Sequence, residues 1–195
     1  MIDSIGKKKV FTKIDLRWGY NNVRIKEVDE WKAAFSMPEE SVEPIVMFFG
    51  LTNSPATFQA TMNDLLRDLV VKEKVTVFID NVMIATEIEE GYDEIVEKVL
   101  KRLEENDLFV KPEKYVWKVR EVGFLGVIIG EDRVRMEKEK VQGVIEWPVP
   151  RSTKDIQMFL GLANYYRWFV KDFARIAKPL REMMRKETKW SWGER

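Results

Sequence analysis

The stretch Phe78-Ile79-Asp80-Asn81 lies between two short runs of β-forming residues, Val75-Thr76-Val77 and Val82-Met83-Ile84. Two such runs separated by a few residues predict a tight β-hairpin. A carboxylate in these apolar surroundings is costly to bury unless a cation or hydrogen bonds compensate its charge. We therefore expect the hairpin to present Asp80 to a cation, with the neutral amide of Asn81 beside it.

A second acid, Asp15, ends the strand-like run Phe11-Thr12-Lys13-Ile14-Asp15-Leu16. On these residues alone two interpretations stay open, a cap of a helix or turn and a metal ligand. Asp80 favours the metal ligand, because two carboxylates from adjacent strands can bridge two Mg²⁺ ions about 4 Å apart. Such a pair of ions serves nucleotidyl transfer.

The composition excludes several classes of chemistry. The chain has 195 residues, 45% of them hydrophobic, which suffices for one large domain or two small ones. It has no Cys and no His, which excludes disulfides, thiolate-bound zinc, catalytic triads and imidazole catalysis. The apolar stretches are too short to span a bilayer and the first residues do not resemble a signal peptide. We expect an intracellular protein, in the cytoplasm or nucleus, with no membrane partner.

The charge is unevenly distributed although the formal net charge is zero. Residues 87–150 carry a net charge of −5 and residues 151–195 a net charge of +6. The basic positions after residue 150 alternate with aromatic ones, including Tyr165, Tyr166 and Trp168. This pattern suits a phosphate backbone, and a solvated helix face explains the charge about equally well.

The periodicity of residues 1–130 predicts an α+β unit. Strands are expected at residues 10–16, 22–25, 33–37 and 42–47. A helix should then begin with Ser54 as N-cap and Pro55 at the first helical position. Its apolar residues follow at helical spacing, namely Phe58, Met62, Leu65, Leu66 and Leu69. The Asp80 hairpin, an amphipathic helix at 89–105 and a second hairpin at 114–129 complete the unit.

After Arg133 the pattern predicts helices, and we place a domain boundary at residues 130–134. The first helix should end at Trp147-Pro148-Val149-Pro150, where two prolines prevent continuation. Ser152 and Asp155 form a capping-box signal for a helix that runs to about residue 169. A last helix is expected at 173–185, kinked or broken at Pro179.

Five stretches resemble, in order, the motifs of gypsy-type LTR-retrotransposon reverse transcriptases. They are residues 11–20 (FTKIDLRWGY), 46–59 (VMFFGLTNSPATFQ), 78–81 (FIDN), 123–126 (GFLG) and 159–167 (FLGLANYYR). The resemblance covers nearly the whole chain, and the ordered series is more specific than any single motif. It implies a polymerase palm over residues 1–130, an antiparallel sheet packed on helices, with the fingers largely missing. A small helical thumb and the start of the connection would occupy residues 131–195.

The resemblance also implies roles for individual residues. Asp15 and Asp80 would bind two Mg²⁺ ions, and Asn81 stands where the family has a third catalytic acid. Tyr20 would be the steric gate against a ribose 2′-OH, and Phe49 and Gly50 would line the incoming nucleotide. The primer grip would comprise Phe124, Leu125 and Gly126.

The thumb contributes Gln157, Gly161 and Tyr165, which fall on one face of the predicted helix. The resemblance implies that this face follows the minor groove of a template-primer duplex. On the residues alone another interpretation stays open, in which Gly161 permits close helix packing. The core face would then be formed by Ile156, Phe159, Leu160 and Ala163.

The sequence departs from the family in ways that bear on activity. Asn81 supplies no negative charge, so metal binding is expected to survive while turnover falls, and Phe78 replaces the usual tyrosine. Residues 36–41 carry two glutamates where the family has a basic turn, and Lys7, Lys8 and Lys9 stand in the wrong place to grip a triphosphate. The chain is expected to lack the fingers before it and the ribonuclease H after it.

Three functions follow from these expectations. The first is an RNA-directed DNA polymerase core that uses an RNA or DNA template-primer duplex and dNTP, with fingers upstream and ribonuclease H downstream if the chain is part of a polyprotein. The second, favoured for the activity of this chain, is a degenerate or repurposed palm-thumb module that binds nucleic acid or a protein without catalysis. The third is a purely structural interaction domain.

Overall fold

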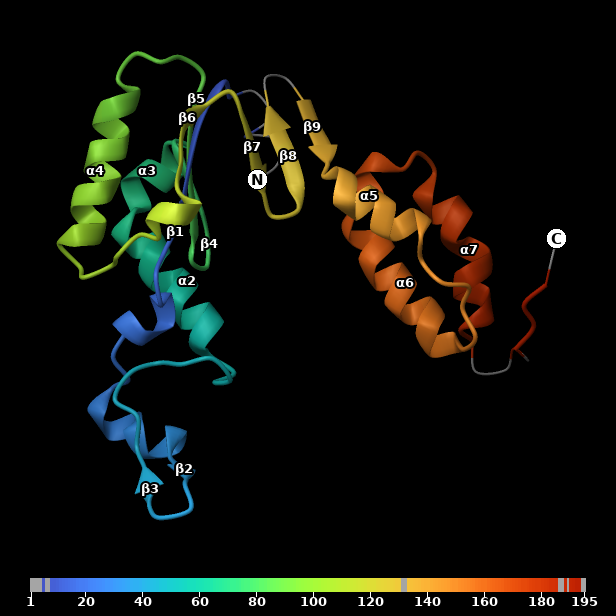
Figure 1. Ribbon diagram of the computed structural model, residues 1–195, viewed down its shortest axis with the longest axis horizontal. Coiled ribbons are helices and arrows are strands. Elements are labelled where there is room, and N and C mark those ends of the chain that lie inside the picture. The colour runs from blue at the N-terminus through green and yellow to red at the C-terminus, as the bar shows by residue number, and fades with distance from the viewer. Residues whose placement is uncertain (1–4, 6–7, 131–132, 186–187, 189, 194–195) are drawn as a thin grey trace. The chain divides into compact units, whose positions relative to one another are not determined.

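The computed structural model describes residues 5, 8–130, 133–185, 188 and 190–193 (Figure 1). The chain forms two compact units. The first consists of Met1–Phe124 and Ile129–Val134, and the second of Leu125–Ile128 and Arg135–Arg195. Of the predicted boundary at 130–134, residues 131 and 132 lie outside the described part of the chain, as does Lys7.

The first unit is built on a four-stranded sheet with the order β4-β5-β1-β6. The strands are β1 (Val10–Asp15), β4 (Val75–Phe78), β5 (Asn81–Thr86) and β6 (Val116–Val119). All neighbouring pairs are antiparallel, and the last residue of β1, Asp15, pairs with the first residue of β5, Asn81. The predicted strand at 10–16 and the predicted hairpin around Asp80 are confirmed.

Three helices pack on this sheet, α2 (Ser54–Leu65), α3 (Arg67–Val71) and α4 (Tyr92–Glu104) (Figure 1). The apolar core between them includes Val10 and Ile14 of β1 and Val82 and Ile84 of β5. Because side chains alternate along a strand, the odd-numbered residues of β1 and β5, Asp15 and Asn81 among them, lie on the opposite face. The architecture confirms the predicted α+β class.

The start of α2 differs by one residue from the prediction. Asn53 is the N-cap, with no side-chain capping bond, and the Asn53 carbonyl accepts the first helical hydrogen bond from Thr57 N–H at 2.9 Å. Ser54 is therefore the first helical residue, and its buried hydroxyl has no hydrogen-bond partner among the described residues. The helix therefore begins beside the Ser-Pro pair, as predicted, but Ser54 lies inside its first turn and Asn53 takes the N-cap position.

The segment between β1 and α2 is less regular than predicted. It contains two 3-10 helices, η1 (Gly19–Asn22) and η2 (Glu27–Ala33), and two short paired strands, β2 (Phe35–Ser36) and β3 (Ser41–Val42). The predicted strands at 22–25 and 42–47 are wrong as strands, because these segments meet only at an isolated bridge between Arg24 and Val46.

The second predicted hairpin, at 114–129, is also corrected. Lys114 ends a 3-10 helix, η3 (Pro112–Lys114), and β6 pairs with β1, a partner about a hundred residues earlier in the chain. The hairpin is instead formed by β7 (Glu121–Phe124) and β8 (Val127–Gly130). A further strand, β9 (Arg133–Met136), joins them where helix was predicted, because exposed and half-buried residues alternate there with the period of a strand.

The second unit is mainly helical, with α5 (Lys138–Ile145), α6 (Thr153–Tyr165), η4 (Arg167–Phe169) and α7 (Phe173–Met183). The Ser152 hydroxyl accepts from Asp155 N–H at 3.2 Å, which confirms the predicted cap. Helix α6 ends before residue 169, and α7 continues through Pro179, which is exposed. No helix in the described part of the chain is long and apolar enough to cross a membrane.

Candidate active site

The tip of the β4–β5 hairpin carries Asp80. Phe78 pairs with Asn81, so only Ile79 and Asp80 connect the two strands. Ile79 has φ +54°, in the left-handed region that β-branched residues rarely adopt. Such a conformation costs about 1–3 kcal/mol and persists only where surrounding contacts impose it.

Two neighbouring elements hold this tip. From α2, Gln59 Oε1 accepts a hydrogen bond from Ile79 N–H at 2.8 Å, and Gln59 Nε2 donates to the Val77 carbonyl at 3.2 Å. From the end of β1, Leu16 N–H donates to the Asp80 carbonyl at 2.8 Å. The backbone on both sides of Asp80 is thereby fixed to the core of the unit.

Asp15 lies at the end of β1 with its side chain only 9% exposed. Its register partner is Asn81, so the two Cβ atoms are about 4.5–5.5 Å apart on one face of the sheet. Asp15 Oδ2 is buried and has no hydrogen-bond partner among the described residues. Lys13 Nζ lies 3.4 Å from Asp15 Oδ2 and forms an ion pair with it that lacks hydrogen-bond geometry. This ion pair compensates the negative charge of the buried carboxylate only in part.

Asn81 contacts Asp80 directly. Its Nδ2 donates a hydrogen bond to Asp80 Oδ1 at 3.0 Å. An aspartate in this place would repel Asp80, whereas the amide binds it and occupies one of its acceptor oxygens. Asn81 therefore lowers the charge of the site and also competes with a cation for Asp80.

The residues present fit a hard divalent cation, although they offer fewer charges than a site with three acids. All candidate ligand atoms are oxygens, the donors that Mg²⁺ prefers, and the orphaned Asp15 Oδ2 is the most strongly desolvated of them. Within the described residues no cluster of three or more acidic, His or Cys side chains is arranged to hold a metal. The candidate ligand side chains are the carboxylates of Asp15 and Asp80 and the amide of Asn81.

Tyr20 lies near this hairpin tip and is 7% exposed. Burial raises the pKa of Tyr20, and the negative charge of Asp80 raises it further. Its ring packs edge-to-face on Phe49, with ring centroids 4.8 Å apart, and on Phe58, at 5.5 Å. A Cβ on the preceding Gly19 would lie 2.8 Å from the Phe58 ring, so this close approach requires glycine.

Phe49 and Gly50 form an exposed turn before α2. Phe49 is 78% exposed even though one edge of its ring contacts Tyr20. Gly50 has φ +113°, a conformation open to glycine, and no described atom lies within 4 Å of a Cβ built there. The structure therefore brings the rings of Tyr20 and Phe49 into contact. Directly after Phe49, the backbone of Gly50 has no described atom near the position of a Cβ.

The turn Leu125-Gly126 follows the buried Phe124 and belongs to the helical unit. Both turn residues have positive φ, +50° and +79°. The Tyr165 hydroxyl donates to the Leu125 carbonyl at 2.5 Å, and the Tyr166 hydroxyl donates to the Gly126 carbonyl at 3.5 Å. A Cβ on Gly126 would lie 2.8 Å from the Tyr166 hydroxyl oxygen, so the end of α6 closes tightly over this turn.

Gln157, Gly161 and Tyr165 all lie on α6 and are exposed. No described atom lies within 4 Å of a Cβ built at Gly161, so the alternative in which this glycine allows close helix packing is not supported. Phe159, Leu160 and Ala163 instead line an apolar cavity of about 330 Å³ among the three helices. The sequence did not indicate that Tyr165 and Tyr166 bind the turn at Leu125.

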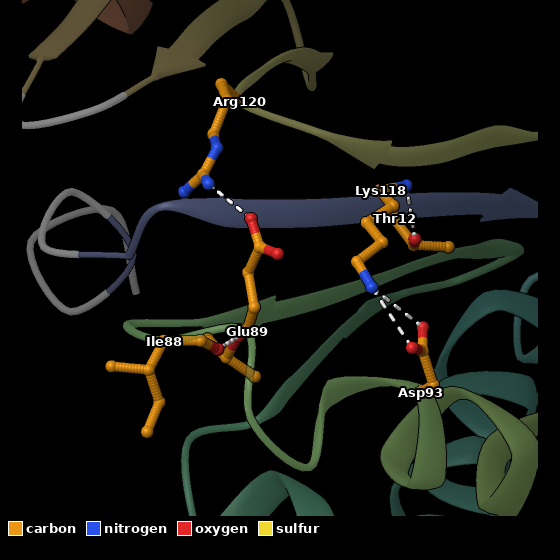
Figure 2. A network of polar contacts seen from close by, with 7 residues as sticks. Thr12, Ile88, Glu89, Asp93, Lys118 and Arg120 are labelled. Carbon is orange, nitrogen blue, oxygen red and sulfur yellow. Dashed lines mark hydrogen bonds and ion pairs between the residues drawn. The ribbon is translucent and has the colours of Figure 1, made fainter.

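A polar network fixes β6 against β1 and α4 (Figure 2). The β1–β6 register shifts between Phe11 and Lys13, and the buried Thr12 hydroxyl there accepts from Lys118 N–H at 3.0 Å. Lys118 Nζ also pairs with Asp93 at 3.0 Å. Arg120, directly after β6, pairs in the same way with Glu89, which lies in the segment before α4. β1, the strand that ends at Asp15, is therefore paired on both sides, with β5 and with β6.

Sequence comparison identifies the family. The family described as reverse transcriptase (RNA-dependent DNA polymerase) matches residues 1–129. The Retrovirus-related Pol polyproteins from transposons gypsy and opus of Drosophila melanogaster are 35% and 36% identical, over 96% and 93% of this chain. The Transposon Tf2-7 polyprotein of Schizosaccharomyces pombe is 30% identical over 98% of it. The chain spans only 14–18% of these polyproteins.

Solved structures agree with this result. A foamy viral protease-reverse transcriptase in complex with an RNA/DNA hybrid has a TM-score of 0.83 and 29% identity, covering 97% of this chain and 26% of that one. A dRH form of the same viral protein in complex with double-stranded DNA has a TM-score of 0.84 and 30% identity, covering 95% and 33%. Together, the matched residues, the shared fold and the transposon relatives show that this chain belongs to the reverse transcriptase family, in the gypsy-type group of retrotransposon Pol polyproteins.

Proposed function

We propose that this chain is the palm and thumb portion of a retrotransposon RNA-directed DNA polymerase, with a two-Mg²⁺ site at Asp15 and Asp80 whose turnover Asn81 impairs. The pairing of Asp15 with Asn81, directly beside the hairpin tip that carries Asp80, supports this proposal most strongly. Asp15 ends β1 and Asp80 lies in the turn that leads into the adjacent strand β5, which supports two carboxylates sharing a pair of ions.

Asp15 and Asp80 would hold the ions, and the Asn81 carbonyl oxygen would add a neutral ligand. Bound Mg²⁺ would supply charge stabilisation for an in-line attack of a primer 3′-oxygen on a dNTP. The chain's own contribution would be to hold the two carboxylates at one end of the sheet, at the last residue of β1 and in the β4–β5 turn. The Leu16 and Gln59 hydrogen bonds to the tip fix the backbone around Asp80 before any ligand binds.

The remaining predicted roles fit this function. Tyr20, buried beside Asp80, would exclude a ribose 2′-OH, and Phe49 and Gly50 would contact the nucleotide. The turn at Phe124, Leu125 and Gly126 would hold the primer. The exposed face at Gln157, Gly161 and Tyr165 would contact the minor groove of a template-primer duplex, since the similar foamy viral protein is solved with such duplexes.

One observation favours a second function, a palm-thumb module that binds nucleic acid or a protein partner without catalysis. Asn81 Nδ2 donates a hydrogen bond to Asp80 Oδ1, so the amide adds a hydrogen bond and no negative charge beside the candidate metal ligand. If the missing charge lowers transition-state stabilisation by about 3 kcal/mol, turnover falls about a hundredfold. A chain impaired to that degree would act mainly as a binding module.

Primer extension on poly(A)/oligo(dT) with Mg²⁺ tests the two functions. We expect no extension by the chain as it stands, and measurable dNTP incorporation after Asn81→Asp. Robust incorporation by the unsubstituted chain would contradict the proposed impairment. A salt-dependent mobility shift with the same duplex, lost in Gln157→Ala/Tyr165→Ala, supports nucleic-acid binding, and its absence would contradict that part of the proposal.

A further inference from the structure

Strand β4 forms one edge of the four-stranded sheet. Phe78 pairs with Asn81 on the β5 side, and backbone groups along a strand point alternately to its two sides. The Val77 carbonyl and the Ile79 N–H therefore point away from β5, toward the open edge. Unpaired groups at such an edge need a hydrogen-bond partner or solvent.

A single side chain binds both groups. The carboxamide of Gln59 accepts from Ile79 N–H at 2.8 Å and donates to the Val77 carbonyl at 3.2 Å. Its nitrogen also donates to Asn63 Oδ1, one turn later in α2, at 3.0 Å, which fixes the rotamer. Gln59 thus takes the place that a peptide group of a neighbouring strand would have, and it does so at the last residues before Asp80.

The strained conformation of Ile79 explains why the Gln59 hydrogen bonds affect the position of Asp80. At φ +54° a β-branched residue is strained, and a turn with this strain tends to relax unless a contact opposes it. The bond from Gln59 Oε1 is to the N–H of Ile79 itself, the group whose direction depends most directly on that φ. Loss of this bond would let the tip relax and would move the adjacent carboxylate.

We propose that Gln59 is a positioning residue for Asp80, holding the strained Ile79 so that the Asp80 carboxylate faces the same site as Asp15. The metal-binding part of this inference rests on the proposed function. Gln59 itself is not a metal ligand, because both ends of its carboxamide are engaged by the backbone and by Asn63. A merely structural role, closing the sheet edge, would leave the metal affinity unchanged.

The variants separate these roles. Gln59→Met keeps the chain length and removes both hydrogen bonds, whereas Gln59→Glu keeps the oxygen that accepts from Ile79 N–H. Thr61→Ala is the matched control, since Thr61 is an exposed residue of the same helix whose hydroxyl, among the described residues, bonds to the Thr57 carbonyl alone. Ile79→Gly removes the strain, because glycine adopts positive φ freely.

Hydrogen exchange of the Ile79 amide, followed by NMR, is the first measurement. We expect exchange to be at least about tenfold faster in Gln59→Met than in the unsubstituted chain, Gln59→Glu or Thr61→Ala, at equal far-UV circular dichroism. Equal exchange rates in Gln59→Met and the unsubstituted chain would overturn the inference, whatever the chain's function.

The second measurement is the Mn²⁺ affinity of each variant, determined by electron paramagnetic resonance. Gln59→Met is expected to bind about tenfold more weakly than Thr61→Ala, and Gln59→Met/Ile79→Gly to recover at least part of the affinity. Faster exchange with unchanged affinity would contradict positioning and leave only edge closure. If the unsubstituted chain binds no Mn²⁺, the proposed metal site fails, and the exchange rates still decide whether Gln59 holds the tip.

Discussion

Asn81 Nδ2 donates a hydrogen bond to Asp80 Oδ1 across 3.0 Å, at the point where Asn81 pairs with Asp15. Asn81 therefore contacts one of the two carboxylates on which the proposed metal site depends, and it is the strand partner of the residue that carries the other. It reduces their mutual repulsion in the absence of metal, and it occupies an oxygen that a cation would need. The same contact favours a stable fold and opposes tight metal binding.

Asp15→Asn is expected to stabilise the metal-free chain. The buried Oδ2 has no hydrogen bond, and a neutral amide of the same shape removes the cost of burying that charge. A gain of about 1 kcal/mol corresponds to a rise of about 2–4 °C in melting temperature for a chain of this size. Differential scanning calorimetry in chelator measures it, with the exposed Glu39→Gln as control. A lower melting temperature for Asp15→Asn would show that its charge is already well compensated.

Thr12→Val should destabilise the first unit more than Lys118→Met does (Figure 2). The valine leaves Lys118 N–H without its acceptor, which costs about 1–3 kcal/mol. Lys118→Met removes a partly exposed ion pair with Asp93, worth under about 1 kcal/mol and weakened by salt. Urea unfolding at low and high salt checks both values. The opposite ranking would mean that the ion pair, rather than the hydroxyl, holds β6 in place.

Tyr165→Phe should weaken the second unit by about 1 kcal/mol, because the Leu125 carbonyl loses its hydroxyl partner. Thermal unfolding measures this loss.

Gly126→Ala should cost more, since it adds a Cβ close to the Tyr166 hydroxyl at a positive φ. Combining Gly126→Ala with Tyr166→Phe removes the oxygen in the way and should recover part of the loss. Thermal unfolding of the unsubstituted chain, Gly126→Ala, Tyr166→Phe and the double variant measures this coupling, and strict additivity would contradict the contact.

Stability should fall at high pH through Tyr92. Burial raises the pKa of this phenol to about 12 from an ordinary value of 10.0. Below pH 10 the phenol is neutral in folded and unfolded chains, so its contribution to stability is fully present. Between pH 10 and about 12 only the unfolded chain loses the proton, so that contribution declines. Urea midpoints across this window should fall less steeply in Tyr92→Phe; equal slopes would exclude Tyr92 as the cause.

Local sequence patterns predicted the parts of the site that depend on neighbouring residues. The β-forming runs around Asp80 and the strand that ends at Asp15 became β4, β5 and β1, because each run is short, apolar and bounded by polar residues. The Ser152 cap was equally local. The prediction of the helix start missed the N-cap Asn53 by one residue, since Asn and Ser are both strongly preferred N-caps and stand next to each other here.

Contacts between distant residues could not be predicted in this way. β6 pairs with β1 rather than with β7, and this pairing depends on contacts across the whole sheet rather than on neighbouring residues. Gln59 binds backbone atoms of residues 18 and 20 positions later in the chain. Such contacts cannot be predicted from the pattern of side chains, because all residue types but proline carry the same main-chain groups. The one available signal was a polar pair, Gln59 and Asn63, spaced one turn apart beside the buried face of α2.

Mn²⁺ affinity in the unsubstituted chain, Asn81→Asp and Asp15→Asn tests the metal site most directly. Electron paramagnetic resonance of free Mn²⁺ gives all three dissociation constants without requiring turnover. We predict weak binding by the unsubstituted chain, binding at least about tenfold tighter in Asn81→Asp, where a third charge is added, and none in Asp15→Asn. Equal affinity in the unsubstituted chain and Asn81→Asp, or undiminished binding in Asp15→Asn, would contradict a metal site built on Asp15 and Asp80 and weakened by Asn81.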